Sequence, residues 1–300
     1  MRRFFLLLLL IMTSAAAESQ LLTYKQILDK PERLQLRPQH VIPYGTDALQ
    51  YGELWLPTTA SNQRLPVVVL IHGGCWRADL PGTELVAFLA DDLRKHGVAV
   101  WSLTYRRIGH KGGGYPGTFD DVAKGVAHLR ELQDKFNLDL TRAVVTGHSA
   151  GGHLALWVAA LAKVPAQSPL ARKPSVNFKA VVGIAAIPDL AHFAGAGTKP
   201  CGENTVAELL DLAARGAAGA PFRDTSPSEM LPLGVKQILI HGVRDGIVPP
   251  DIGLRYQAQA KASGENVEVN TQDNAGHFEL IAPWTVAGRV VVNTILDALK

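Results

Sequence analysis

A serine lies between glycines at the point where an apolar run gives way to a helical pattern. Residues 147–151 read G-H-S-A-G, which is the G-x-S-x-G spacing of a nucleophile elbow with Ser149 at its centre. Flanking glycines remove the Cβ atoms that would collide in so tight a turn. A helix that begins here adds positive potential and a free N–H from Ala150. We therefore predict that Ser149 is a nucleophile.

A serine hydroxyl needs a base to take its proton and a third group to orient that base. His277 follows Gly276 in a loop before the last helical pattern, and Asp245 lies just past the end of an apolar strand pattern. The chain order Ser149, Asp245, His277 is the one expected when such a triad is built on an α/β fold. We predict that Ser149 attacks, His277 shuttles the proton and Asp245 orients His277.

An oxyanion hole is the fourth part that this chemistry requires. The stretch I-H-G-G-C-W at 71–76 follows an early strand pattern, where the second amide donor should lie. Gly73 and Gly74 let the backbone turn both amides toward a developing negative charge, so we predict them as donors together with Ala150. His72 is expected to anchor this loop by a hydrogen bond.

Other residues near these motifs admit more than one interpretation. Trp76 either walls the substrate pocket or packs in the core, and His148 is expected to line the pocket or cap the helix. Arg106, at the end of a strand pattern, either pairs with Asp120 or Asp121 or binds a substrate carboxylate. Nothing at ligand spacing supports a metal site, and the proposed chemistry needs no cofactor.

Strand and helix patterns alternate along the chain and must position these residues. Continuous apolar runs rich in β-branched residues, such as 67–71, are typical of buried parallel strands. The alternation predicts an α/β fold with a doubly wound, mostly parallel sheet. Strands are expected at 49–57, 67–71, 98–105, 143–147, 179–187, 235–242 and 266–272, and helices at 83–96, 119–136, 252–263 and 285–299.

One domain is expected over residues 18–300. Residues 188–232 break the alternation and are rich in alanine, glycine and proline, with one helical stretch at 203–216. We expect this segment to be a lid-like insertion over the carboxyl edge of the sheet.

The combined motifs resemble the α/β-hydrolase superfamily over nearly the whole of residues 18–300. One branch of this superfamily is more specifically similar, because it pairs H-G-G-x-W, here at 72–76, with GHSAGGHLALW, here at 147–157. Residues 105–122 are also similar to that branch. That branch is bacterial and groups with kynurenine formamidase-like and feruloyl-esterase-like ester hydrolases. The resemblance implies the triad and oxyanion roles given above. Cys75 departs from the pattern, because many relatives carry glycine, alanine or an aromatic residue there.

The expected activity is that of a serine hydrolase that cleaves small or medium carboxylic esters through an acyl-enzyme. An arylformamidase-type amide hydrolase is the close alternative. A non-catalytic binding protein on this scaffold is a second alternative. Such proteins usually lose the serine or the histidine, and both residues are present here. A dehalogenase-like enzyme would carry aspartate in place of Ser149. The natural acyl and alcohol groups and the oligomeric state stay open.

The N-terminus has the pattern of a secretory signal peptide. Arg2 and Arg3 precede an apolar run at 4–12, which is shorter than the about 20 residues that a spanning helix needs. Alanines at 15–17 form a small-x-small cleavage site. We expect removal of residues 1–17 and a periplasmic or secreted protein with no stable membrane anchor. Without the two arginines, 28 basic residues stand against 27 acidic ones, so the charge gives no reason to expect nucleic acid.

The two cysteines are candidates for a disulfide. Cys75 directly follows the oxyanion glycines, and Cys201 lies early in the 188–232 insertion. Both should lie near the carboxyl edge of the sheet, within the Cα separation of about 5.5–6 Å that a disulfide needs. In an oxidising compartment they would then join. The alternative is two unrelated cysteines, with Cys75 buried as a small apolar residue.

Export predicts a defined mature N-terminus. Mass spectrometry of the protein purified from its native host should find the chain beginning at or near Glu18, because cleavage follows Ala17. An intact Met1 in a soluble cytosolic fraction would refute export and would favour the formamidase alternative.

Overall fold

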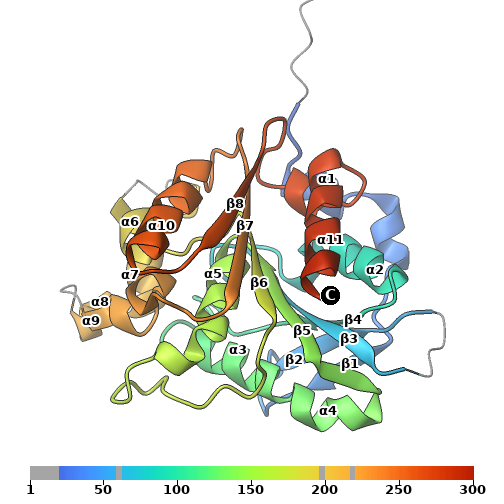
Figure 1. Ribbon diagram of the computed structural model, residues 1–300, viewed down its shortest axis with the longest axis horizontal. Coiled ribbons are helices and arrows are strands. Elements are labelled where there is room, and N and C mark those ends of the chain that lie inside the picture. The colour runs from blue at the N-terminus through green and yellow to red at the C-terminus, as the bar shows by residue number, and fades with distance from the viewer. Residues whose placement is uncertain (1–19, 59–62, 196–199, 217–219) are drawn as a thin grey trace, which may run out of the picture.

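The computed structural model describes residues 20–58, 63–195, 200–216 and 220–300. Across these residues the strands form one eight-stranded sheet in the order β1-β2-β4-β3-β5-β6-β7-β8 (Figure 1). Their bounds are β1 His40–Pro43, β2 Tyr51–Trp55, β3 Leu65–Ile71, β4 Ala99–Leu103, β5 Leu138–His148, β6 Ala180–Ile184, β7 Lys236–Gly242 and β8 Val267–Gln272. The pairings of β2 with β1 and with β4 are antiparallel, and all the others are parallel. The predicted fold class is confirmed.

The central strands are buried on both faces. Residues Val67 to Ile71 of β3 are completely inaccessible to solvent, and every residue of β4 and β6 is buried. Such strands need apolar side chains on both sides because helices cover both faces of a parallel sheet. The first strand, β1, was not predicted. It is an edge strand whose side chains are mostly exposed, so its sequence carries no apolar alternation.

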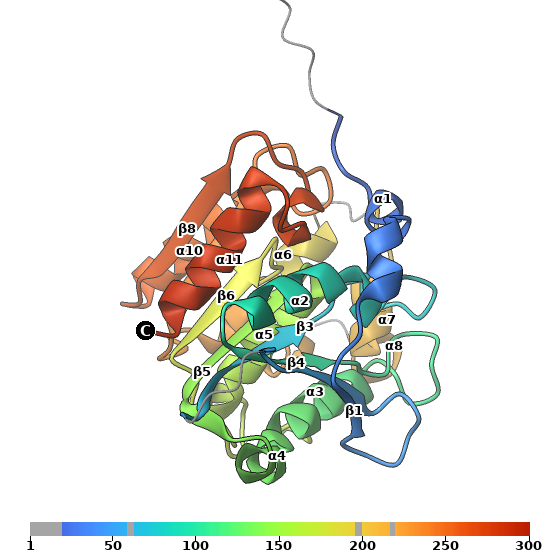
Figure 2. The same cartoon turned by 90° about the vertical axis from the view of Figure 1, so that its right-hand side faces the viewer.

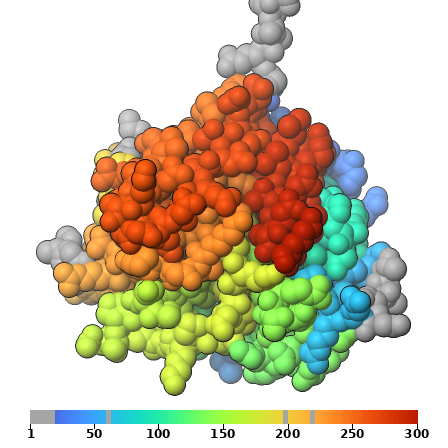
Figure 3. Space-filling view, viewed as in Figure 1, coloured from blue at the N-terminus to red at the C-terminus, as the bar shows by residue number. Residues whose placement is uncertain are grey.

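Helices lie on both faces of the sheet. One face carries α2 (Ala87–Lys95) and α11 (Val286–Ala298), which contact each other, and Figure 3 shows the red C-terminal surface against the teal segment that contains α2. The other face carries α3 (Gly117–Ala127), α5 (Ala150–Ala159) and α10 (Pro250–Ala262). The helix predicted at 119–136 divides at His128 into α3 and α4 (Leu129–Lys135), and α4 packs on β5. The helix predicted at 83–96 begins as the short 3-10 helix η2 (Thr83–Leu85).

The 188–232 insertion is anchored on the helix that follows the elbow. Its described part forms short helices joined by turns. Trp157 of α5 donates from Nε1 to the carbonyl of Asp224 at 2.8 Å, and the Asp224 carboxylate accepts from Tyr115 and Arg215. The helices are α6 Leu190–Gly195, α7 Thr205–Leu210, α8 Leu212–Arg215, α9 Ala220–Arg223 and η4 Pro227–Met230.

The N-terminal segment consists of α1 (Tyr24–Leu28) and the 3-10 helix η1 (Pro31–Gln35), which lead into β1. Figure 2 shows α1, in blue, along one side of the molecule, where the described chain begins. The predicted signal peptide, residues 1–17, lies outside the described residues. Within the described ranges, no helix is both long and apolar enough to cross a bilayer.

A buried ion pair fixes the start of α3. Arg106 donates to Asp121 from Nε at 2.8 Å and from a terminal guanidinium nitrogen at 2.7 Å, and the Asp121 side chain is completely buried. The Asp121 carboxylate also accepts from Gln50 and from the Arg106 backbone. Of the two roles considered for Arg106, the geometry is that of a structural ion pair.

Removing this carboxylate should destabilise the protein strongly. We expect Asp121→Ala to lower the free energy of unfolding by about 3–5 kcal/mol, because it leaves the Arg106 guanidinium uncompensated. Asp134→Ala is the matched control. Asp134 also accepts from an arginine, Arg64, but both side chains are exposed, and an exposed pair contributes about 0–1 kcal/mol. Urea denaturation of both variants measures the difference, and equal losses would contradict the structural role assigned to Asp121.

Candidate active site

Ser149 occupies the turn between β5 and α5. Its backbone has φ 56° and ψ −120°, a conformation that is strained for a residue with a Cβ. The neighbouring glycines allow this turn. A Cβ on Gly151 would lie 2.1 Å from the Ile71 carbonyl oxygen, and one on Gly147 would lie 2.2 Å from the Gly151 oxygen. The turn therefore packs directly against the end of β3, which leads into residues 72–76, the candidate oxyanion loop.

A histidine and a carboxylate are paired beside this turn. His277 Nδ1 lies 2.6 Å from Asp245 Oδ2, and both side chains are buried. The other carboxylate oxygen of Asp245 accepts from the backbone N–H groups of Ile247 and Val248 at 2.7 and 2.9 Å. Burial alone would raise the pKa of the Asp245 carboxyl. The hydrogen bond and charge of His277, together with the two amides, outweigh burial and hold that pKa below its usual range.

Asp245 and His277 come from two loops that pack together. The Arg244 N–H donates to the Ala275 carbonyl at 2.9 Å, so the loop after β7 is joined to the loop after β8. Gly242 makes this approach possible, since a Cβ there would lie 2.3 Å from the Ala275 oxygen. The two loops therefore bring the carboxylate and the imidazole together from residues that are 32 apart in the chain.

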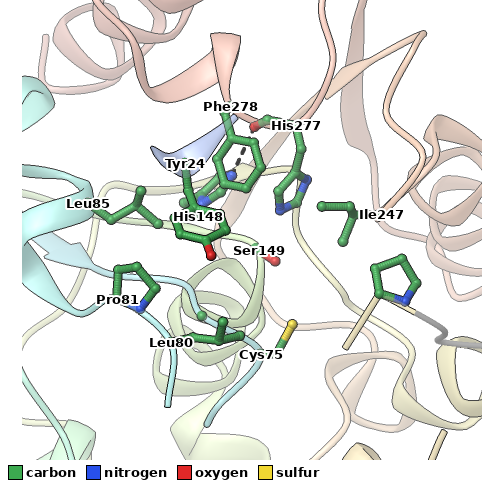
Figure 4. Close-up of a pocket in the computed structure, with 12 residues that line it drawn as sticks. Tyr24, Cys75, Leu80, Pro81, Leu85, His148, Ser149, Ile247, His277 and Phe278 are labelled. Atoms are coloured by element: carbon green, nitrogen blue, oxygen red, sulfur yellow. Dashed lines mark hydrogen bonds between the residues drawn. The ribbon is translucent and has the colours of Figure 1, made fainter. Parts of the chain in front are cut away.

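Ser149 and His277 face one pocket (Figure 4). The Ser149 hydroxyl makes no hydrogen bond to the His277 ring or to any other described residue. Catalytic hydrogen bonds in unliganded enzymes are often long and close only with substrate bound. The structure thus brings together the three residues predicted as a triad, with the His277–Asp245 contact already made.

His148 holds the carbonyl of His277. Its Nε2 lies 3.0 Å from the His277 backbone oxygen, and the two ring centroids are 4.4 Å apart. Complete burial, followed by the charge of His277, lowers the pKa of His148 to about 3. His148 is therefore a neutral imidazole that donates from Nε2. It lines the pocket, in keeping with one of the two roles considered from the sequence.

His72 anchors the loop after β3. Its Nδ1 lies 2.7 Å from the Gly73 oxygen, and its ring stacks on Tyr105, whose hydroxyl donates to the His72 carbonyl at 2.9 Å. Burial and the nearby charge of Arg107 lower the pKa of His72 to about 3, so it stays neutral and donates from Nδ1. The three residues that follow Gly73 have positive φ, with values of 98°, 49° and 56° at Gly74, Cys75 and Trp76.

The predicted oxyanion donors lie in the loop after β3 and at the start of α5. Gly74 and Cys75 line the pocket, whereas Gly73 lies behind it, where a Cβ would be 2.8 Å from the His148 carbonyl oxygen. No described residue accepts a hydrogen bond from the backbone N–H of Gly73, Gly74, Cys75 or Ala150. The three predicted donors therefore stay candidates, and Cys75, which was not predicted, is a fourth.

Trp76 does not wall the pocket. It is fully buried, and its Nε1 donates to His153 Nδ1 at 3.2 Å. The second nitrogen of His153 lies 2.8 Å from the Thr225 carbonyl oxygen, so this histidine connects the loop after β3 to the insertion. Burial lowers the pKa of His153 to about 4, which keeps it neutral. Of the two roles considered for Trp76, the structure shows core packing, because the side chain is buried and does not line the pocket.

The pocket walls are largely apolar. No Lys, Arg, Asp or Glu is among the described residues that line it. The sequence predicted none of these apolar walls. Tyr24 lies 125 positions before Ser149, and no local pattern in the sequence relates the two. The apolar walls are Tyr24, Leu80, Pro81, Leu85, Pro200, Ile247 and Phe278.

A disulfide joins the oxyanion loop to the insertion. The Cα atoms of Cys75 and Cys201 are 5.5 Å apart, and the two sulfurs are bonded. Pro200, which precedes Cys201, also lines the pocket. The described part of the insertion therefore reaches the pocket at this point and is covalently held to the loop that carries the candidate oxyanion amides.

The described residues contain no cluster of three or more His, Cys, Asp or Glu side chains that would hold a metal ion. His148 and His153, which flank the elbow, both make the hydrogen bonds described above instead.

The chain is similar to two curated proteins that are named esterases. It is 27% identical over 247 residues to Esterase LipC of Mycobacterium tuberculosis (strain ATCC 25618 / H37Rv), a match that covers 79% of this chain and 57% of LipC. It is 26% identical over 277 residues to Esterase LipQ of the same strain, which covers 90% of this chain and 63% of LipQ. The chain thus spans less than two thirds of the length of these curated relatives.

Solved structures agree on the fold. A crystal structure of inhibited esterase B from Lactobacillus rhamnosis superposes with a TM-score of 0.73 at 20% identity, covering 89% of this chain and 90% of that one. The family model BD-FAE matches residues 53–258, which is more than half of the chain. The matched range contains the elbow, the oxyanion loop and Asp245. The chain belongs to the BD-FAE family and has the α/β-hydrolase fold.

Proposed function

We propose that this protein is a serine hydrolase that cleaves carboxylic esters through an acyl-enzyme on Ser149. The observation that carries the proposal is the buried His277–Asp245 contact of 2.6 Å at the pocket that also contains the strained Ser149. A carboxylate in this position selects the tautomer of the imidazole and stabilises its cation. The second imidazole nitrogen, Nε2, is then free to accept the serine proton.

The reaction proceeds in two halves. The Ser149 oxygen attacks the ester carbonyl carbon while His277 takes the hydroxyl proton, which gives a tetrahedral oxyanion. Collapse of this intermediate expels the alcohol, which receives the proton from His277, and leaves an acyl-enzyme. Water then attacks the acyl carbon with His277 as general base, and the carboxylic acid departs.

The backbone amides supply the electrostatic part of catalysis. The N–H groups of Gly73, Gly74, Cys75 and Ala150 lie in the loop after β3 and at the start of α5, and no described residue accepts a hydrogen bond from them. The N-terminus of α5 adds positive potential at the same point. Removal of one such donor typically costs about 10²–10³ in kcat.

The names of the relatives favour esters over amides. Two curated relatives and the superposed structure are called esterases. The described pocket walls carry no ionised group beyond the catalytic residues, which suits an uncharged, apolar substrate group. A panel of p-nitrophenyl esters of rising chain length, with an aryl formamide beside them, separates the ester hydrolase from the arylformamidase alternative.

Export is part of the same proposal. It is supported by the short apolar run at 4–12 and the alanines at 15–17. The Cys75–Cys201 disulfide is consistent with an oxidising compartment such as the periplasm or the extracellular medium.

Removing the nucleophile should abolish turnover. We expect Ser149→Ala to lower kcat for p-nitrophenyl butyrate on the order of 10⁶-fold, as in other enzymes with this triad. The variant should remain folded by circular dichroism, because alanine removes only the hydroxyl oxygen. Residual activity within tenfold of wild type would exclude Ser149 as the nucleophile.

Protonation of a single group should inactivate the enzyme at acid pH. His277 must be neutral to act as base, whereas the lowered pKa of Asp245 keeps that carboxylate ionised and the pKa of about 3 keeps His148 neutral. A plot of log kcat/KM against pH should therefore fall with a slope of one on the acid side. A flat profile would show that His277 is not the base, and a slope of two above pH 4 would show that a second group titrates.

A further inference from the structure

The N-terminal segment, residues 20–28, lies at the edge of the pocket. It is ordered by a capping box, in which the Thr23 hydroxyl accepts from the Gln26 N–H and the Gln26 side chain accepts from the Thr23 N–H. Ile27 is fully buried, and α1 packs on η2, whose Leu85 is itself a pocket wall. The segment is thus built onto the site.

Glu279 holds this segment against the loop that carries His277. One carboxylate oxygen accepts from the Leu22 N–H, and the other accepts from the Gly276 N–H at 2.9 Å. Gly276 directly precedes His277. The Glu279 side chain is buried, so it makes these bonds away from bulk water, where a charged acceptor is strong. One carboxylate therefore joins two segments that are more than 250 residues apart.

Tyr24 completes the wall on this side. Its ring centroid is 6.0 Å from that of Phe278, and Phe278 in turn lies 5.0 Å from the His277 ring. Figure 4 shows Tyr24 beside Phe278, Leu85 and His148 around the mouth of the pocket. Tyr24 is also 42% exposed, so it separates the pocket from solvent.

We propose that Tyr24 is a specificity-determining residue that limits the length of the apolar ester group bound on this side, and that Glu279 is the positioning residue that keeps it there. The inference rests on the proposed ester hydrolase activity. Because solvent lies behind Tyr24, removal of its ring opens the pocket outward. A longer apolar chain then fits the pocket and contacts Phe278 and Leu85, while a short chain loses its contact with the Tyr24 ring.

The test compares two series of esters. One series varies the acyl chain from acetyl to decanoyl on p-nitrophenol, and the other varies the alcohol from methanol to octanol on a butyryl group. We expect Tyr24→Ala to raise the ratio of kcat/KM for long-chain esters to kcat/KM for short-chain esters in one of the two series. The expected increase is about tenfold or more, because a few methylenes in an apolar pocket usually have an effect of this size. Tyr24→Phe should keep the wild-type ratio because it keeps the ring.

Leu34→Ala is the control for the segment. Leu34 lies in η1, is 63% exposed and does not line the pocket, so this variant should leave both ratios unchanged. Ratios for Tyr24→Ala within twofold of wild type in both series would overturn the inference. If wild type hydrolyses no ester in either series, the proposed function itself fails, which is a different result from an active enzyme whose ratios do not move.

Glu279→Gln tests the positioning role. The amide NH₂ would face one of the two N–H donors, so the segment should loosen and the chain-length ratio should move in the same direction as in Tyr24→Ala. Glu265→Gln is the matched control, because Glu265 also accepts two backbone N–H groups, from Leu233 and Gly234 at 2.7 Å each, but lies outside the pocket. A uniform loss of activity on all esters, with no change in ratio, would overturn the role assigned to Glu279.

Discussion

The site depends on one close approach between backbones. Gly151, in the first turn of α5, lies against the carbonyl groups of Ile71 and His72 at the end of β3, so closely that a Cβ would overlap them. This contact places the elbow from β5 beside the loop from β3. The strained φ of Ser149 lies on one side of this contact, and the positive φ values at Gly74, Cys75 and Trp76 lie on the other. A parallel sheet makes the approach possible because its strands end at a common edge.

Buried histidines hold this arrangement in place. His72, His148 and His153 are each kept neutral by burial, and each directs a ring nitrogen to a backbone carbonyl. A neutral imidazole presents one donor and one acceptor in a fixed direction, which suits it to join loops in a dry interior. His277 differs because its Nδ1 faces the side-chain carboxylate of Asp245 instead of a backbone carbonyl.

The pocket is assembled from parts that are distant in the chain. The N-terminal segment supplies Tyr24, the insertion supplies Pro200, and the loop after β8 supplies Phe278. The Cys75–Cys201 bond and the Glu279 carboxylate hold two of these parts to the oxyanion loop and to the His277 loop. The framework of the site comes from the sheet, while the walls come from segments attached to it.

Local patterns in the chain were enough to predict the fold class, the turn at Ser149 and the order of Ser149, Asp245 and His277. Glycine spacing and β-branched runs act within a few residues, so they can be recognised without knowledge of distant contacts. Three-dimensional packing was needed to show that Cys75 rather than Gly73 lines the pocket, that Trp76 turns into the core, and that Tyr24 and Glu279 adjoin the His277 loop. Such contacts join residues that are far apart in the chain, so no periodic pattern in the sequence reveals them. They depend on where whole segments pack, and that is determined by burial over the entire molecule.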